Sequence, residues 1–226
     1  MGLQKARKLE LELYLNRHLI LLHQTAYDIP GSSVTILGCT LWSKVPHKAR
    51  ETVHSKIQDF KKVQDWTVDD HNASHDADRT WLLDEIKSLQ TKNKNKTQNK
   101  KRDILVVTHH APSLKNTSSP RHANNPWNSA FGTDILSQIS DLRGVKAWVI
   151  GHTHYCTEFV ERGIRVVANQ RRYVLPWNES KREKGTREQL RTSDGFDKGF
   201  VTKDVSIASN EDVNLATVLS ESRTSQ

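Results

Sequence analysis

The sequence predicts an α/β fold, and three observations support this prediction. Several short segments are rich in β-branched and aliphatic residues, which favour strands. A segment around Trp81 and Ile86 instead repeats its apolar residues at helical spacing. Two of the strand-like segments, "DILVVT" and "AWVI", are followed closely by histidines. Ligand-binding residues of open α/β sheets lie at the carboxyl ends of the strands, so we expect a functional site there.

The expected strands are short runs between turn residues, such as the Pro-Gly turn that precedes the second of them. They lie at Leu19 to Leu22, Val34 to Thr40, Ile104 to Thr108, Lys146 to Ile150, Cys156 to Val160 and Ile164 to Ala168. The expected helices lie at Leu3 to Glu12, Arg50 to Val63, from about Ala77 to Leu89, and at Thr133 to Leu142. Gly144 follows the last of these, as glycine often does at a helix end.

Two polar stretches separate these elements. The sequence "DDHNASHDAD", Asp69 to Asp78, is expected to be a solvated loop that caps the following helix, with a set of metal ligands as the alternative. The stretch after the histidines, from His109 to Gly132, carries several prolines and little apolar content. Loops of this length are usually functional or disordered.

Composition and charge indicate how the chain is divided into domains. A chain of 226 residues with 35% hydrophobic content is expected to form one core with sizeable polar additions. Much of the formal net charge of +8 lies in a basic, low-complexity loop at residues 87–102, which has no acidic residue. It is interpreted as solvated rather than as a nucleic-acid surface, because no aromatic side chain is interleaved for base stacking. Residues 177–226 are expected to be a polar, disordered tail.

The two cysteines, Cys39 and Cys156, both lie in strand-like segments and are expected to be buried thiols. This excludes a disulfide framework and favours a reducing compartment. No apolar run approaches the roughly 20 residues that span a bilayer, and no secretory signal is present. The sequence therefore predicts a soluble, cytoplasmic protein without a membrane partner.

The segments "VVTHHAP" and "VIGHTHY" carry the candidate site residues. Gly151 lets the backbone turn as it leaves the strand, and His152 and His154, two residues apart in extended chain, are expected to point the same way. A single histidine is most often a satisfied polar residue, but two pairs at strand ends favour a metal site. Neutral imidazole suits first-row ions such as zinc, manganese or iron.

"VVTHHAP" followed by "VIGHTHY" resembles the last two metal motifs of the calcineurin-like metallophosphoesterases. The resemblance extends over "VTILGCTLWS" and "VANQRRYV", and it is greatest to a fungal branch described as Ser/Thr protein phosphatase family proteins. It implies a four-layer α-β-β-α sandwich with two divalent ions at one edge. His109 and His152 would ligate one ion and His154 the other, and His110 and Asn169 would contact the substrate. The implied activity is hydrolysis of phosphate esters by a metal-activated water.

The family also has Asp-x-His, Gly-Asp and Gly-Asn-His-Glu motifs, which supply the bridging carboxylate and the general acid. None of them precedes "ILGCTLWS" here, so residues 1–176 are expected to be a partial domain without its N-terminal strands. Arg172 also stands where the family has glycine in Asn-x-x-Gly-Tyr. This difference is consistent with a relaxed functional constraint on the site region. A truncated chain with little activity of its own is the main expectation.

Two other function classes remain open at this point. The first is a non-catalytic remnant or interaction protein of the same fold, and the second is a basic nucleic-acid-binding module that uses residues 87–102. Protein phosphate, nucleotide, phospholipid head group and small phosphate ester all fit the histidine motifs as substrates. Neither the metal nor the oligomeric state has a readable signal in the sequence.

Overall fold

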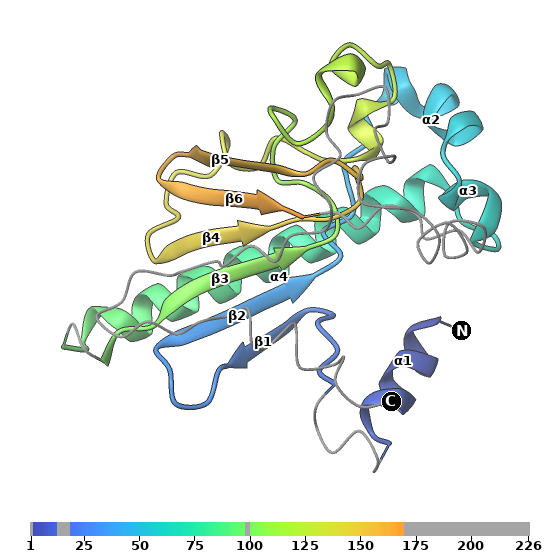
Figure 1. Ribbon diagram of the computed structural model, residues 1–226. Coiled ribbons are helices and arrows are strands. Elements are labelled where there is room, and N and C mark those ends of the chain that lie inside the picture. The colour runs from blue at the N-terminus through green and yellow to red at the C-terminus, as the bar shows by residue number, and fades with distance from the viewer. Residues whose placement is uncertain (1, 13–18, 98–99, 170–226) are drawn as a thin grey trace, which may run out of the picture.

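A six-stranded mixed sheet forms the centre of the protein in the computed structural model, which describes residues 2–12, 19–97 and 100–169 (Figure 1). The strands are β1 (Thr25–Asp28), β2 (Val34–Cys39), β3 (Asp103–Thr108), β4 (Val145–Val149), β5 (Thr157–Glu161) and β6 (Ile164–Ala168). Their order in the sheet is β1-β2-β3-β4-β6-β5. The four inner strands are parallel, whereas the edge strands β1 and β5 are antiparallel to their neighbours. The mixed α/β class is thereby confirmed.

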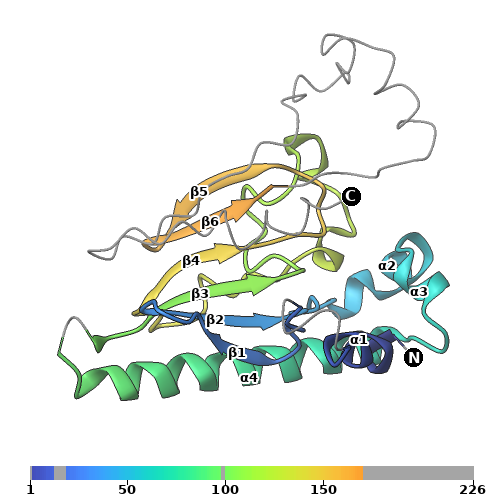
Figure 2. The same ribbon diagram turned by 60° about the horizontal axis from the view of Figure 1, so that its bottom comes forward.

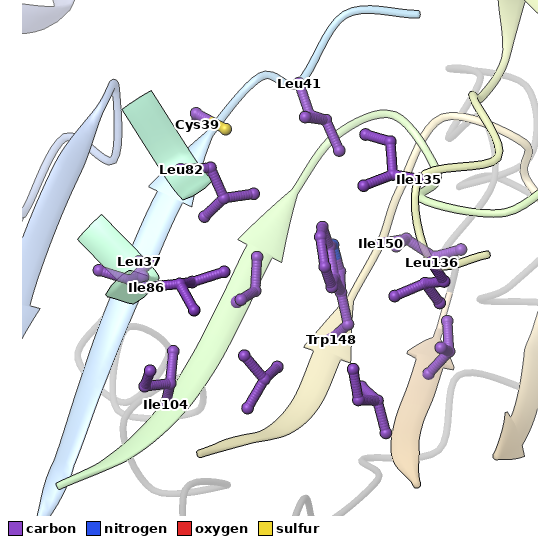
Figure 3. Packing of buried hydrophobic residues seen from close by; sticks show 14 of the residues in the cluster. Leu37, Cys39, Leu41, Leu82, Ile86, Ile104, Ile135, Leu136, Trp148 and Ile150 are labelled. Carbon is purple, nitrogen blue, oxygen red and sulfur yellow. The ribbon is translucent and has the colours of Figure 1, made fainter. Parts of the chain in front are cut away.

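The helices are α1 (Gly2–Glu10), α2 (Arg50–Lys56), α3 (Asp59–Lys62) and α4 (Val68–Lys94), with short 3-10 turns at His47–Ala49, Pro120–His122 and Asn128–Ala130. Helix α4 runs along one face of the sheet (Figures 1 and 2). Its buried Leu82 and Ile86 point toward Leu37 of β2, and Trp148 of β4 lies in the same cluster (Figure 3). This face holds the largest apolar core.

Helix α4 begins nine residues earlier than the sequence predicted, at Val68 rather than Ala77. The Thr67 hydroxyl accepts from the Asp70 amide at 3.1 Å, and the Asp70 carboxylate accepts from the Thr67 amide at 3.0 Å. Such a reciprocal cap satisfies two of the amide groups that a helix start leaves unpaired. The interpretation of "DDHNASHDAD" as a solvated loop was therefore wrong, because that stretch forms the first turns of the helix.

Other predicted elements also changed in the structure. The strand expected at Leu19 to Leu22 is irregular chain, and β1 follows it instead. The helix expected from Arg50 to Val63 is divided into α2 and α3 by Ile57, whose backbone is extended at φ −87° and ψ 134°. The basic stretch expected as a loop is helical as far as Lys94.

The helix expected at Thr133 to Leu142 is replaced by turns. The amides of Ile135 and Leu136 donate to the carbonyl oxygen of Pro112 at 2.8 and 3.1 Å, rather than forming a helical ladder. Both side chains are fully buried against the sheet. The carbonyl of Leu136 in turn accepts from the Arg162 guanidinium at 2.7 Å. Tertiary hydrogen bonds thus take the place of helical ones.

The described residues contain one sheet, and the second sheet of a sandwich is not among them. The sheet face opposite the α4 core carries a separate apolar cluster around Val34, Leu105 and Ala147, all buried. Within the described part of the chain, no helix is long and apolar enough to cross a membrane. The predicted tail at 177–226 and Arg172 lie outside the described residues.

The two cysteines differ in their surroundings. Cys39 is buried as predicted, and burial followed by the nearby Asp78 charge raises the pKa of its thiol to about 12. Cys156 is exposed, so the prediction of a buried thiol was wrong there. It lies just before β5 rather than inside the strand, and therefore does not face the core.

Candidate functional site

The candidate site lies where β3 and β4 end. The two strands are parallel neighbours, so their carboxyl ends meet at one edge of the sheet. His109 directly follows β3, and His152 follows β4 by a short turn. Nδ1 of His152 lies 2.9 Å from Nε2 of His109, and the ring centroids are 4.7 Å apart. The structure therefore brings together two of the three predicted metal ligands.

Backbone contacts hold this pair in place. The amides of His109 and His110 donate to the carbonyl oxygen of Thr40 at 3.2 and 3.1 Å, and the Gly151 amide donates to the carbonyl of His109 at 3.1 Å. A Cβ on Gly151 would lie 3.1 Å from His109 Nδ1, so this close approach favours glycine. Gly151 also begins a tight turn, as predicted, because its carbonyl oxygen accepts from the Thr153 amide at 2.8 Å.

His152 and His154 both have left-handed backbones, with φ of 63° and 52°. The prediction that they project in parallel from extended chain was therefore wrong. Non-glycine residues rarely adopt this conformation, and such strain is concentrated at functional sites. The turn directs His152 toward His109, and the charge of His154 acts on both of these rings.

A layer of aromatic rings supports His152. His110 is 1% exposed and stacks on it, with centroids 4.2 Å apart and an interplanar angle of 27°. Phe131 lies 5.1 Å from His152, and Trp42 lies 5.4 Å from His110. The predicted substrate contact of His110 stays a prediction, since in this structure the ring is covered by its neighbours.

The segment Leu41 to Val45 after β2 is clamped by side chains from successive turns of α4, which the sequence reasoning missed. The contacts are Asp78 Oδ2 with the Leu41 amide at 2.8 Å, His75 Nδ1 with the Trp42 carbonyl at 2.6 Å, His71 Nε2 with the Ser43 hydroxyl at 2.9 Å, and Asn72 with the Val45 amide and carbonyl at 2.8 and 3.0 Å. The helical spacing of these polar residues was the available signal. The clamp fixes Trp42 against His110.

Burial keeps the site histidines neutral. Burial, followed by the charges of His109 and His154, lowers the pKa of His152 to about 3. Burial also lowers the pKa of His109, and it lowers that of His110 well below the usual value. A neutral imidazole keeps a lone pair for a metal, whereas a protonated one does not.

The arrangement of the site histidines fits a metal ion only in part. Two nitrogen ligands about 2.1 Å from one ion, with a right angle between them, stand about 3 Å apart, close to the observed 2.9 Å. Nε2 of His152, the ring nitrogen that does not face His109, is buried without a hydrogen-bond partner among the described residues. However, among the described residues no three His, Cys, Asp or Glu side chains are grouped to hold one ion. His109 and His152 are thus the ligand pair that the structure supports, and His154 does not complete it.

The acidic residues weighed as substitute ligands have other partners. Asp69 pairs with Arg50 at 2.6 Å, and Asp76 pairs with Lys44. Asp70 caps α4, and Asp78 is part of the clamp. These four carboxylates therefore serve the fold around α4. Asn169, which follows β6, lies with its Oδ1 3.9 Å from Cys156 Sγ, and its predicted role toward substrate stays a prediction.

Comparison with known proteins adds one distant relative. No family model matches the chain, and no solved structure matches it. "Uncharacterized protein L509" of Acanthamoeba polyphaga mimivirus is 27% identical over 170 residues, which is 69% of this chain and 55% of the viral protein. The chain therefore spans about half the length of that relative. The name of that relative states no activity.

Proposed function

We propose that this chain provides the histidine ligands of a metal-dependent phosphoesterase, which hydrolyses phosphate esters with a metal-activated water. The observation that carries the proposal is the neutral pair of His109 and His152 at adjoining strand ends, with ring nitrogens 2.9 Å apart. The motif resemblance supports the reaction class, and the apolar cluster at Val34, Leu105 and Ala147 supports a second sheet packed on that face.

In this proposal His109 and His152 bind a divalent manganese, iron or zinc ion, and His154 serves a second one. Such ions lower the pKa of bound water and offset charge on the phosphoryl oxygens. The protein orients the ligands: His110 stacks on His152, and the α4 clamp holds Trp42 against His110. Fixed ligand orientation matters because supporting contacts strongly influence metal affinity.

The first test is metal binding. In calorimetric titration with manganese we expect about one weakly bound ion per chain, because neutral imidazoles compensate little of a dication's charge. His152→Ala should remove the binding, whereas the exposed His122→Ala serves as the matched control and should bind like the native chain. Tight binding of two equivalents would contradict the expected stoichiometry, and no binding would contradict the proposal.

The second test is hydrolysis of p-nitrophenyl phosphate with added manganese. The 226-residue chain should hydrolyse this ester at a rate near background. The reason is that it carries neither the bridging carboxylate nor the general acid in their family motifs. A longer protein that carries those motifs ahead of Met1 should hydrolyse the ester several orders of magnitude faster. The reason is that positioning of the substrate and stabilisation of charge supply most of the reduction in the barrier. His152→Ala should abolish that gain. A longer product with all motifs and no metal-dependent turnover would overturn the proposal.

A further inference from the structure

The end of α4 and its connection to β3 carry a group of exposed lysines. The members of this lysine cluster are Lys92, Lys94, Lys96 and Lys100. No acidic residue lies between positions 87 and 102. Within the part of the chain that the structure describes, no ion pair joins a member of the cluster to a carboxylate. Four positive charges are therefore presented together without a described counter-charge.

The lysine cluster lies away from the candidate site. Figures 1 and 2 both show the C-terminal end of α4 extending past the sheet, beside the start of β3. His109 follows the last residue of β3, whereas the cluster precedes the first. The six residues of β3 put about 20 Å of extended chain between these two ends. The cluster is thus a surface distinct from the histidine pair.

Side-chain hydrogen bonds close the base of the connection. The Asn93 side-chain amide donates to the Arg102 carbonyl oxygen at 2.9 Å, and Asn93 Oδ1 accepts from the Arg102 amide at 2.9 Å. The guanidinium of Arg102 is itself fixed, because its Nε donates to the Thr35 hydroxyl at 2.6 Å and lies 3.0 Å from the Asp28 carboxylate. Arg102 therefore serves the fold, and the lysines are held on a connection whose two ends are joined.

The residues between the lysines indicate what the surface can bind. In the segment 91–102, "TKNKNKTQNKKR", every residue that is not basic is Asn, Gln or Thr. Lysine, amide and hydroxyl side chains are the usual contacts to phosphate oxygens of nucleic acids. No aromatic side chain is present to stack on bases, and no apolar one to insert into a lipid surface. This chemistry favours a partner that displays many phosphates on its outside.

We propose that the lysine cluster binds the phosphate backbone of a nucleic-acid duplex without reading its sequence. The sequence-based interpretation as a solvated loop rested on missing stacking residues, which contacts to a duplex backbone do not require. A duplex carries one negative charge per about 1.7 Å of its axis, and lysines that neutralise its phosphates release condensed counterions. The inference is independent of the proposed hydrolysis and of metal binding.

Fluorescence anisotropy of a labelled DNA duplex, titrated with the full chain in a buffer with EDTA, tests the inference. With a mixed-sequence duplex of about 20 base pairs, we expect a Kd of about 1–100 µM at about 50 mM salt. A second duplex of unrelated sequence should bind within about twofold, because backbone contacts carry no sequence information. Since EDTA removes metal ions, the result does not depend on the proposed function.

Charge-matched variants locate the surface. Replacing all four members of the cluster by glutamine, which has a similar helix propensity, should weaken binding about 100-fold at low salt. The slope of log affinity against log salt should become shallower by about one for each lysine removed. The control loses the same charge elsewhere and should bind within a few fold of the native chain. It replaces four other exposed lysines by glutamine: Lys5, Lys48, Lys61 and Lys62.

Circular dichroism establishes that each variant is folded. If the fourfold cluster variant is not, the double variant Lys94→Gln with Lys96→Gln should still lower the slope by about two. Equal affinity of the cluster and control variants would overturn the inference, as would no binding by the native chain at about 100 µM and low salt. Polyglutamate bound as tightly as the duplex, or phosphatidylserine vesicles bound more tightly, would overturn the assignment to nucleic acid.

Discussion

Replacing Trp148 with alanine should lower the free energy of unfolding by about 3–5 kcal/mol. The indole is fully buried at the centre of the α4-facing core (Figure 3). Its removal loses apolar burial and leaves a cavity that a close-packed interior fills only in part. Urea unfolding followed by circular dichroism measures the change.

The same substitution should also disturb the candidate site. Trp148 Nε1 donates to the Thr108 hydroxyl at 2.9 Å, and that hydroxyl donates to the carbonyl oxygen of His110 at 2.7 Å. The core tryptophan thus holds the end of β3 where the histidines begin. Trp148→Phe keeps most of the apolar burial and loses the hydrogen-bond donor. It should therefore lower the free energy of unfolding clearly less than Trp148→Ala does. Equal losses in the two variants would show that packing of the indole is not the main contribution.

Lowering the pH from 7 to 5 should remove about 2 kcal/mol of stability through His71 alone. Burial, followed by the charge of His75, lowers the pKa of His71 to about 4, from 6.5 in the unfolded chain. Between these values the unfolded state binds more protons than the folded state. This stability is therefore complete above about pH 6.5 and is lost progressively as the pH falls toward 4.

The surroundings of His71 explain why it stays neutral. Its ring lies 5.1 Å from Trp42 and 5.5 Å from Phe60, and the neighbouring titratable groups are His75 and His110. Burial lowers the pKa of both neighbours as well, so they add to the acid sensitivity. No carboxylate pairs with the His71 ring within the described residues, and a proton there would be poorly compensated.

The variant His71→Gln tests this assignment. Glutamine presents an acceptor where Nε2 meets Ser43 and does not titrate, so stability at pH 7 should fall while its dependence on pH between 7 and 5 becomes shallower by about 2 kcal/mol. Urea midpoints at both pH values measure it, with the exposed His122→Gln as the control. An unchanged difference between pH 7 and pH 5 in His71→Gln would assign the acid sensitivity to other groups.

Local pattern was enough to place the strands β2, β3, β4 and β6, because continuous apolar runs between turn residues have few other stable arrangements. It also located the histidines at strand ends, and with them the pair His109 and His152. Periodicity identified the apolar half of α4 for the same reason. These features depend on neighbours in the chain, which the sequence displays directly.

The polar half of α4 could not be assigned in this way. In the sequence its histidines and aspartates are indistinguishable from solvated residues. Their hydrogen-bond partners lie in the segment after β2, about 30 positions away in the chain. Likewise, Ile135 and Leu136 find the carbonyl of Pro112 only in the folded chain. Long-range hydrogen bonds thus overrode local propensity in both places.

By itself, the sequence determined the α/β class, the inner strands and the two histidine motifs that meet at the sheet edge. The tertiary structure alone decided that His110 stacks on His152, that His152 and His154 adopt left-handed backbones, and that Asp69 and Asp76 pair with Arg50 and Lys44. The physical reason is that burial, ring contacts and ion pairing depend on which distant segments meet, whereas strand and helix patterns depend on adjacent residues.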